Sequence, residues 1–320
     1  MTDIADASPE QISTLLKTIS GGTYFRPYAS NTIEVSFLTS APTYQGDLSS
    51  YNGNFRKTEG GSPSFGQFNA AEQLKIKAAF SAISKVANID FVYTENPSPG
   101  AIRLGKAEVF IPGKKSVGGA NIQTGGDRQQ PLVNDIFLPL TTGSNDLDFG
   151  RPGFLDLLHE IGHALGLTKH PSEEDFSKDI QLSRAVSMVS YADWLTPRGT
   201  LQDRKGMTPL ILDILALQTL WGLPEPAHGG NPGNTTYTFS PDSSPAITDS
   251  SDTTLYKTQT RAIWDSGGTD TFSASAYSAT EGVIIELRPG YLSSIGGTKN
   301  IGIAFNAQIE NSIGGQAMTF

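Results

Sequence analysis

Residues 159–170 read His-Glu-Ile-Gly-His-Ala-Leu-Gly-Leu-Thr-Lys-His, and this stretch decides the fold and the chemistry of the chain. His159 and His163 are four residues apart, so in a helix they lie on one face, about one turn from each other, and can reach the same metal ion. Glu160 would project near that metal, where a carboxylate can take a proton from bound water. The segment therefore predicts a zinc site on a helix, with Glu160 as the catalytic base.

The surrounding residues strengthen this interpretation. The chain has only four histidines, and three of them fall within residues 159–170. Residues 154–158 form an apolar helical face that leads into the motif, and Gly166 is the expected end of the helix. Beyond Gly166 the chain can bring His170 back as a third ligand, which gives catalytic zinc its open fourth position for water. The competing interpretation is a surface helix with two solvated histidines.

The motif is part of a longer pattern. Residues 159–167 are accompanied, in order along the chain, by the segments 135–138, 187–191, 208–218, 263–271 and 309–315. Together these segments resemble the serralysins, bacterial zinc proteases of the metzincin clan. In that family they correspond to the strand before the active-site helix, the Met-turn with its tyrosine, the last helix of the catalytic domain, and the module that follows. The resemblance covers most of the chain.

This resemblance implies an α+β fold. We expect a metzincin-like catalytic domain with a twisted mixed sheet and an active-site helix over residues 152–166, followed by a small β-rich module that begins a β-roll. The family's glycine-rich calcium repeats are missing. The composition changes beyond residues 221–226 to short strands separated by Gly, Asn, Asp and Ser. We therefore place a zinc metalloprotease domain at residues 1–225 and a calcium-binding module at residues 226–320.

Periodicity predicts several elements independently of the resemblance. Apolar residues at helical spacing predict a helix over residues 69–86, and an alternating pattern predicts a half-buried strand over residues 32–38. Residues 44–66 are rich in Gly, Ser, Tyr and Asn and predict a long surface loop. The last helix of the first domain is expected over residues 207–220.

Two departures from the family pattern concern the predicted site. Three residues separate Gly166 from His170, where the family has two, and a one-residue bulge in the loop accounts for the difference. The competing third ligand is a glutamate, as in thermolysin-like enzymes, but Glu173 and Glu174 lie too close to the end of the helix. The Met-turn reads Ser-Met-Val-Ser-Tyr over residues 187–191, where the family usually has Ser-Val-Met-Ser-Tyr. An ungapped match thus places valine beneath the zinc.

The resemblance also implies further site residues. Tyr191 would bind zinc at rest and then donate a hydrogen bond to the tetrahedral intermediate. Two calcium ions would link the loop at residues 265–270 to an upstream segment and to a downstream glutamate. The implied calcium ligands are Asn231, Gly233, Thr235, Asp265, Gly267, Gly268, Asp270, Gln308 and Glu310. The predicted cofactors are therefore Zn²⁺ and Ca²⁺.

Composition narrows the partners. The chain has 320 residues, a net charge of −9 and a sequence pI near 4.9, which argues against nucleic acid and anionic membrane surfaces as partners. It contains no cysteine, so disulfides and thiolate metal sites are excluded. No stretch has the length and apolarity of a membrane span, and residues 1–10 do not form a secretory signal peptide. The family leaves the cell without such a signal, so we expect a secreted bacterial monomer that acts on proteins or peptides.

Two functions follow from the sequence. The first is a zinc endopeptidase that hydrolyses peptide bonds of extended substrates through a zinc-bound water and Glu160. The second is a zinc- and calcium-binding protein with weak or no proteolytic activity, which acts as a binding or surface module. The shifted positions of His170 and Met188 favour the second function, whereas the intact Glu160 favours the first, because a pure binding site needs no base.

Overall fold

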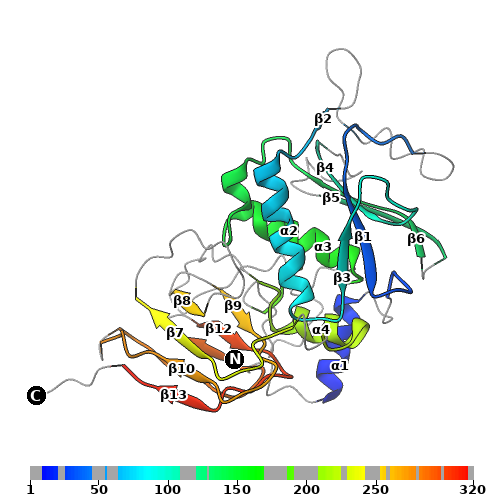
Figure 1. Cartoon of the computed structure of the whole chain (residues 1–320). Helices are drawn as coiled ribbons and strands as arrows, with labels where there is room; N and C mark the ends of the chain where they lie inside the picture. The colour runs from blue at the N-terminus through cyan, green and yellow to red at the C-terminus, as the bar shows by residue number, and fades with distance from the viewer. Residues whose placement is uncertain are drawn as a thin grey trace, which may run out of the picture.

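The structure is a computed structural model that describes residues 9–20, 26–44, 55, 64–108, 120–127, 130–168, 186–190, 208–224, 229–241, 253–256, 260–278, 281–296 and 299–315. Helices and strands both occur, and the strands form three sheets, so the predicted α+β class is confirmed. Figure 1 shows the largest sheet with helices α2 and α3 in one body, and the two smaller sheets in a second body. None of the described helices is long and apolar enough to cross a membrane.

The largest sheet has six strands, namely β1 (Thr32–Phe37), β2 (Phe65–Gly66), β3 (Asp90–Tyr93), β4 (Ile102–Ala107), β5 (Ala120–Asp127) and β6 (Gln130–Leu138). Their order is β3-β1-β4-β6-β5, and the short β2 pairs with β4. The pairs β3-β1, β1-β4 and β4-β6 are parallel, whereas β5 runs antiparallel to β6. Among the described strands, β5 therefore lies at one edge of a mixed sheet.

Helices α2 (Ala70–Ser84) and α3 (Pro152–Ala164) cover one face of this sheet, and η3 (Ser144–Leu147) leads into α3. Asn69 and Glu72 cap the start of α2 reciprocally: each side chain accepts a hydrogen bond from the other residue's backbone amide. The alternate residues of the strands and the apolar faces of the two helices share one core. Its members include Ile33, Val35, Leu104, Ile136, Ile76, Phe80, Phe154, Leu158 and Ile161.

The opposite face of the sheet is covered at Tyr44 and Phe55. Both are buried, and the Phe55 ring packs edge-on against Phe137 of β6, with ring centroids 5.2 Å apart. The Tyr44 hydroxyl donates a hydrogen bond to the carboxylate of Asp135. The guanidinium of Arg103 donates two further hydrogen bonds to the same carboxylate. The expectation that residues 44–66 form only a surface loop is therefore wrong at these two aromatic positions, since they supply a small second core.

The second body consists of short strands, namely β7 (Thr236–Ser240), β8 (Thr254–Tyr256), β9 (Arg261–Ile263), β10 (Thr271–Ser273), β11 (Leu292–Ser294), β12 (Lys299–Ile303) and β13 (Asn311–Ile313). One sheet is all parallel, with the order β13-β10-β7-β8. The other has the order β11-β12-β9 and pairs β12 with β9 in parallel. Two parallel neighbouring strands cannot be joined by a tight hairpin, so the chain needs a longer crossover connection between them.

Helix α4 (Ile211–Trp221) lies between the two bodies and contacts α1 (Pro9–Ile19) (Figure 1). Gly302 of β12 lies directly against Ile211, since a Cβ at position 302 would come 2.4 Å from Cδ1 of the isoleucine. The Asn306 side chain donates to Gln218, which in turn donates to the carbonyl of Val86. The expected boundary at residue 225 falls in the segment 225–228, outside the described residues, so the division at that point stays a prediction.

Candidate metal centre

Helix α3 places both motif histidines on one face. The two Nε2 atoms lie 3.0 Å apart and the ring planes are perpendicular. Two nitrogen ligands of tetrahedral zinc, each at about 2.0–2.1 Å from the ion, would be about 3.3 Å apart. His159 and Glu160 are buried, and His163 is partly exposed. The four-residue spacing thus converges on a point where one ion can bind, as the sequence predicts for His159 and His163.

Hydrogen bonds on the far side of each ring fix which nitrogen faces the metal. Nδ1 of His159 lies 3.0 Å from the carbonyl oxygen of Met188, and Nδ1 of His163 contacts the carbonyl oxygen of Leu167. A carbonyl oxygen only accepts, so each Nδ1 must carry the proton and donate it. Each Nε2 then carries a lone pair that can bind a cation, which is the tautomer that metal-binding histidines use. This donor set fits zinc.

The carboxyl end of α3 is built to turn the chain back toward His163. Helix α3 ends at Ala164, two residues before the predicted end, and Gly166 has a φ of 106°, which favours glycine. The amide of Leu167 donates to the carbonyl of Gly162 over 2.9 Å, and this bond directs the Leu167 carbonyl at the His163 ring.

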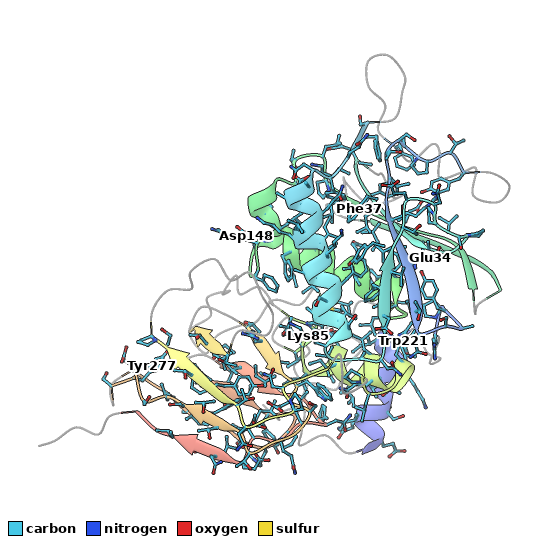
Figure 2. All side chains as sticks on the ribbon, viewed as in Figure 1. Glu34, Phe37, Lys85, Asp148, Trp221 and Tyr277 are labelled. Atoms are coloured by element: carbon cyan, nitrogen blue, oxygen red, sulfur yellow. The ribbon has the colours of Figure 1, made fainter. Side chains whose placement is uncertain are left out.

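Two side chains satisfy the last carbonyls of the helix. Asn134 of β6 donates to the carbonyl of Ala164, and the indole nitrogen of Trp221 donates to the carbonyl of Leu165. Buried terminal carbonyls need such partners, because the helix itself offers none. Figure 2 labels Trp221, where α4 reaches the main body. The sheet and α4 therefore both hold the end of the helix that carries His163.

Met188 and Val189 form the floor beneath the histidines. Both side chains are buried, and a Cβ on Gly162 would lie 2.8 Å from Cε of Met188 and 3.2 Å from Cγ1 of Val189. Glycine at position 162 therefore lets both side chains approach the helix closely. The ungapped match placed valine alone beneath the site, but the methionine methyl group reaches the helix as well, because its longer side chain bridges the offset of one residue.

The sequence missed one residue of this floor. Asp213 of α4 is completely buried, and its carboxylate accepts hydrogen bonds from Ser187 and Met188. Burial raises the pKa of Asp213 to about 7, although these bonds and one from Leu210 act in the opposite direction. In the sequence Asp213 is only an interruption of an apolar helix. An acidic residue in the first turn of a helix is the signal that could have identified it as a cap.

Several predicted site residues lie outside the described part of the chain. They are His170, Tyr191 and the competing ligands Glu173 and Glu174. Among the residues that the structure does describe, no three His, Cys, Asp or Glu side chains converge as a metal-binding group. Of the predicted zinc ligands, the described residues therefore include His159 and His163, with Glu160 beside His159 in sequence, and the third ligand stays a prediction.

The predicted calcium residues gather around Asp270. Its Oδ1 accepts from the amide of Thr235 over 2.7 Å, and its own amide donates to the Glu310 carboxylate over 2.7 Å. Its Oδ2 is buried and has no donor among the described N–H and O–H groups, and the Asp265 carboxyl lies close enough to share a proton with Asp270. Burial raises the pKa of Asp270, and the neighbouring charges of Asp265 and Glu310 raise it further. A buried carboxylate oxygen without a donor is a position that a hard cation could satisfy.

The loops around Asp270 bring most of the other predicted ligands together. Asp265 accepts a hydrogen bond from the hydroxyl of Tyr237, and this hydroxyl in turn accepts one from the side chain of Asn231. Burial raises the pKa of Asp265. Gly268 lies against the upstream segment, since a Cβ there would come 2.6 Å from the carbonyl oxygen of Gly233. Two predicted ligands remain. The amide of Gly267 donates a hydrogen bond to Asp265, and Gln308 is exposed.

Comparison with known proteins agrees with this architecture. Residues 230–319 match the family model described as the peptidase M10 serralysin C terminal. Serralysin A and Serralysin C of Dickeya chrysanthemi are 30% and 31% identical over 282 and 287 residues, each alignment covering 81% of this chain. Serralysin of Proteus mirabilis is 34% identical over 194 residues, which is 54% of this chain and 36% of the relative.

The chain is serralysin-like. The resemblance drawn from the motif is thereby confirmed, on the matched module and on the relatives together. The chain spans about half the length of the two Dickeya relatives, 54% and 55%. Similarity thus covers most of this chain and stops short of a large part of those proteins.

Proposed function

We propose that this serralysin-like chain is a zinc-dependent endopeptidase that hydrolyses peptide bonds of extended protein substrates. The observation that carries the proposal is the pair of Nε2 atoms at 3.0 Å, each ring fixed from behind by a backbone carbonyl. His159, His163 and His170 would hold the metal. Zinc in such a site acidifies a water molecule and polarises the carbonyl under attack.

Glu160 is the general base in this proposal. It follows His159 directly on α3 and, like His159, is buried. Its carboxylate would take the proton as water attacks the scissile carbonyl and then pass that proton to the leaving amine. Tyr191 would donate a hydrogen bond to the oxyanion that forms on the substrate.

Strand β5 would bind the substrate. It is the edge of the described sheet beyond β6 and lies next to α3. An edge strand has backbone amides and carbonyls on its open side that can pair with an extended peptide. A peptide paired with β5 in this way would lie extended alongside α3. This mode of binding favours unfolded or extended polypeptides as substrates.

The β-rich module would bind calcium. Support comes from Oδ2 of Asp270, which has no donor among the described groups, and from the raised pKa of Asp265 and Asp270, because a cation would offset the charge that burial makes costly. Calcium should raise the melting temperature of the parent, since it binds the folded state alone. Asp270→Ala should lose most of that gain. Equal melting temperatures of the parent in calcium and in a calcium chelator, at constant zinc, would rule the site out.

The remaining expectations form part of the same proposal. A secreted bacterial monomer with a catalytic domain at residues 1–225 and a calcium-binding module at residues 226–320 is consistent with the serralysin relatives and with the matched module. The second candidate function is a metal-binding protein with weak or no proteolysis. The observation that favours it is the spacing of three residues between Gly166 and His170.

Zinc content and casein hydrolysis separate the two functions. The endopeptidase should bind about one zinc and lose hydrolysis in a chelator, whereas the binding protein should keep zinc and leave casein intact. His170→Ala should weaken zinc binding about tenfold or more if it is the third ligand. Unchanged affinity in that variant, with a loss in Glu173→Ala or Glu174→Ala, would assign the third ligand to a glutamate instead.

A further inference from the structure

One buried carboxylate joins α4 to the floor of the metal centre. Asp213 Oδ1 accepts from the hydroxyl of Ser187 over 2.8 Å, and Oδ2 accepts from the amides of Met188 at 2.7 Å and Leu210 at 2.9 Å. The amide of Leu212 donates to the carbonyl of Val186 over 3.0 Å. The start of α4 therefore holds residues 186–188 at several points.

The backbone of Met188 connects Asp213 to His159 on α3. Its amide donates to Asp213, and its carbonyl accepts from Nδ1 of His159. Both backbone groups of one residue are thus fixed, the first by the carboxylate and the second by the ring. If the amide loses its anchor, the Met188 carbonyl is free to move, and with it the bond that sets the tautomer and tilt of the imidazole.

A helix cap alone does not account for Asp213. Capping would require only the bond to Leu210, and an exposed acidic residue can make that bond at little desolvation cost. Asp213 is instead completely buried, and its two other bonds reach residues 26 and 25 positions earlier in the chain. Burying a carboxylate is costly unless its oxygens are well supplied with donors. The buried carboxylate instead holds residues 187 and 188, the segment beneath the metal centre, in place.

We propose that Asp213 is a positioning residue for the zinc ligand His159, acting through the backbone of Met188. This inference rests on the proposed zinc site, although its test does not depend on proteolysis. Asp213→Asn keeps the size of the side chain but removes its charge. The amides of Met188 and Leu210 then bond to a neutral oxygen and lose their charge-assisted bonds, whereas the Ser187 hydroxyl can turn to accept from the new NH₂ group. Ser187→Ala removes one donor and leaves the bond from the Met188 amide in place.

The experiment compares Asp213→Asn and Ser187→Ala with Gln218→Met. Gln218 is a buried polar residue on the same helix that bonds to Val86 and Asn306, away from the metal centre. Zinc affinity is measured by competition with a chelator, and the tautomer of His159 is measured in the metal-free protein by ¹⁵N NMR. Stability is recorded for all three variants by urea unfolding.

Asp213→Asn should weaken zinc binding about tenfold or more, in the range for partners that orient metal ligands, and His159 should lose its Nδ1–H preference. Ser187→Ala should show a smaller loss of affinity, and Gln218→Met should keep parental zinc affinity whatever its stability. The proposal is overturned if Asp213→Asn keeps parental affinity and tautomer, or if Gln218→Met weakens zinc equally. Should Asp213→Asn not fold, Asp213→Ala takes its place, because it removes the acceptor of the Met188 amide, and parental zinc affinity and tautomer in that variant overturn the proposal.

The same measurements separate this inference from the proposed function. A parent that binds zinc with the Nδ1–H tautomer but leaves casein intact would refute the endopeptidase and leave the positioning role standing. A parent that hydrolyses casein while Asp213→Asn behaves like it in both zinc affinity and tautomer would refute the positioning role alone.

Discussion

Gly268→Ala should destabilise the β-rich module strongly, whereas Gly233→Ala should be nearly neutral. The two glycines face each other across the loops around Asp270. Gly268 has a φ of 127°, a conformation that residues with a Cβ rarely adopt, and its Cβ would lie 2.6 Å from the Gly233 carbonyl oxygen and 3.0 Å from the Asn234 amide nitrogen. Both obstacles are backbone atoms, which cannot rotate away as a side chain would.

The expected magnitude follows from these two penalties. A residue other than glycine in this backbone region costs about 1–3 kcal/mol, and forced overpacking costs about 1–3 kcal/mol. The free energy of unfolding should therefore fall by about 2–6 kcal/mol in Gly268→Ala. A Cβ on Gly233 would have no heavy atom within 4 Å, and its φ lies outside the left-handed region. Gly233→Ala should thus change stability by no more than about 0.5 kcal/mol.

Urea unfolding in a calcium chelator, followed by tryptophan fluorescence, measures this difference without any contribution from bound metal. Trp264 follows β9 in the module, and its signal is read together with those of Trp194 and Trp221, the other two tryptophans of the chain. Gly268→Ala should lower the urea midpoint while Gly233→Ala leaves it unchanged. Equal midpoints for the two variants would mean that the loops do not pack as described, and the calcium proposal would then lose its geometry.

Two further predictions concern pH and rate. In a calcium chelator Asp265 and Asp270, like Asp213, should each lower the free energy of unfolding as the pH rises above 3.8 toward neutrality. Their pKa values are raised, so the folded state holds their protons longer than the unfolded chain does. Asp270→Asn should flatten this slope in urea titrations between pH 4 and pH 7, and an unchanged slope would contradict the assignment. Tyr191→Phe should lower kcat with little change in KM in peptide hydrolysis, since its hydroxyl would act on the transition state; a rise in KM alone would limit the hydroxyl to substrate binding.

Local patterns predicted the elements that carry the site. Apolar spacing predicted the helix at residues 69–86, seen as Ala70–Ser84, and the alternation at residues 32–38 predicted the strand seen as Thr32–Phe37. The convergence of His159 and His163 followed from helix geometry alone, because a separation of four residues fixes one face. These features depend on neighbours along the chain and can therefore be read from the sequence.

Contacts between distant segments could not be predicted in this way. Helix α4 begins at Ile211 instead of residue 207, because Leu210 is extended and its amide bonds to the Asp213 carboxylate. Composition marked the region around Tyr44 as a surface loop, yet its aromatic side chain packs on the sheet. The close approach of Met188 to Gly162 likewise depends on how two segments meet in space, which spacing along the chain does not specify.

Replacement of Glu160 tests the central claim most directly. Zinc content and casein hydrolysis are compared in the parent, in Glu160→Ala and in the isosteric Glu160→Gln. If Glu160 is the base and the histidines hold the metal, both variants should retain about one zinc per chain and lose hydrolysis. Variants that retain zinc and cleave casein as fast as the parent would contradict the role of Glu160 and the proposed endopeptidase mechanism with it.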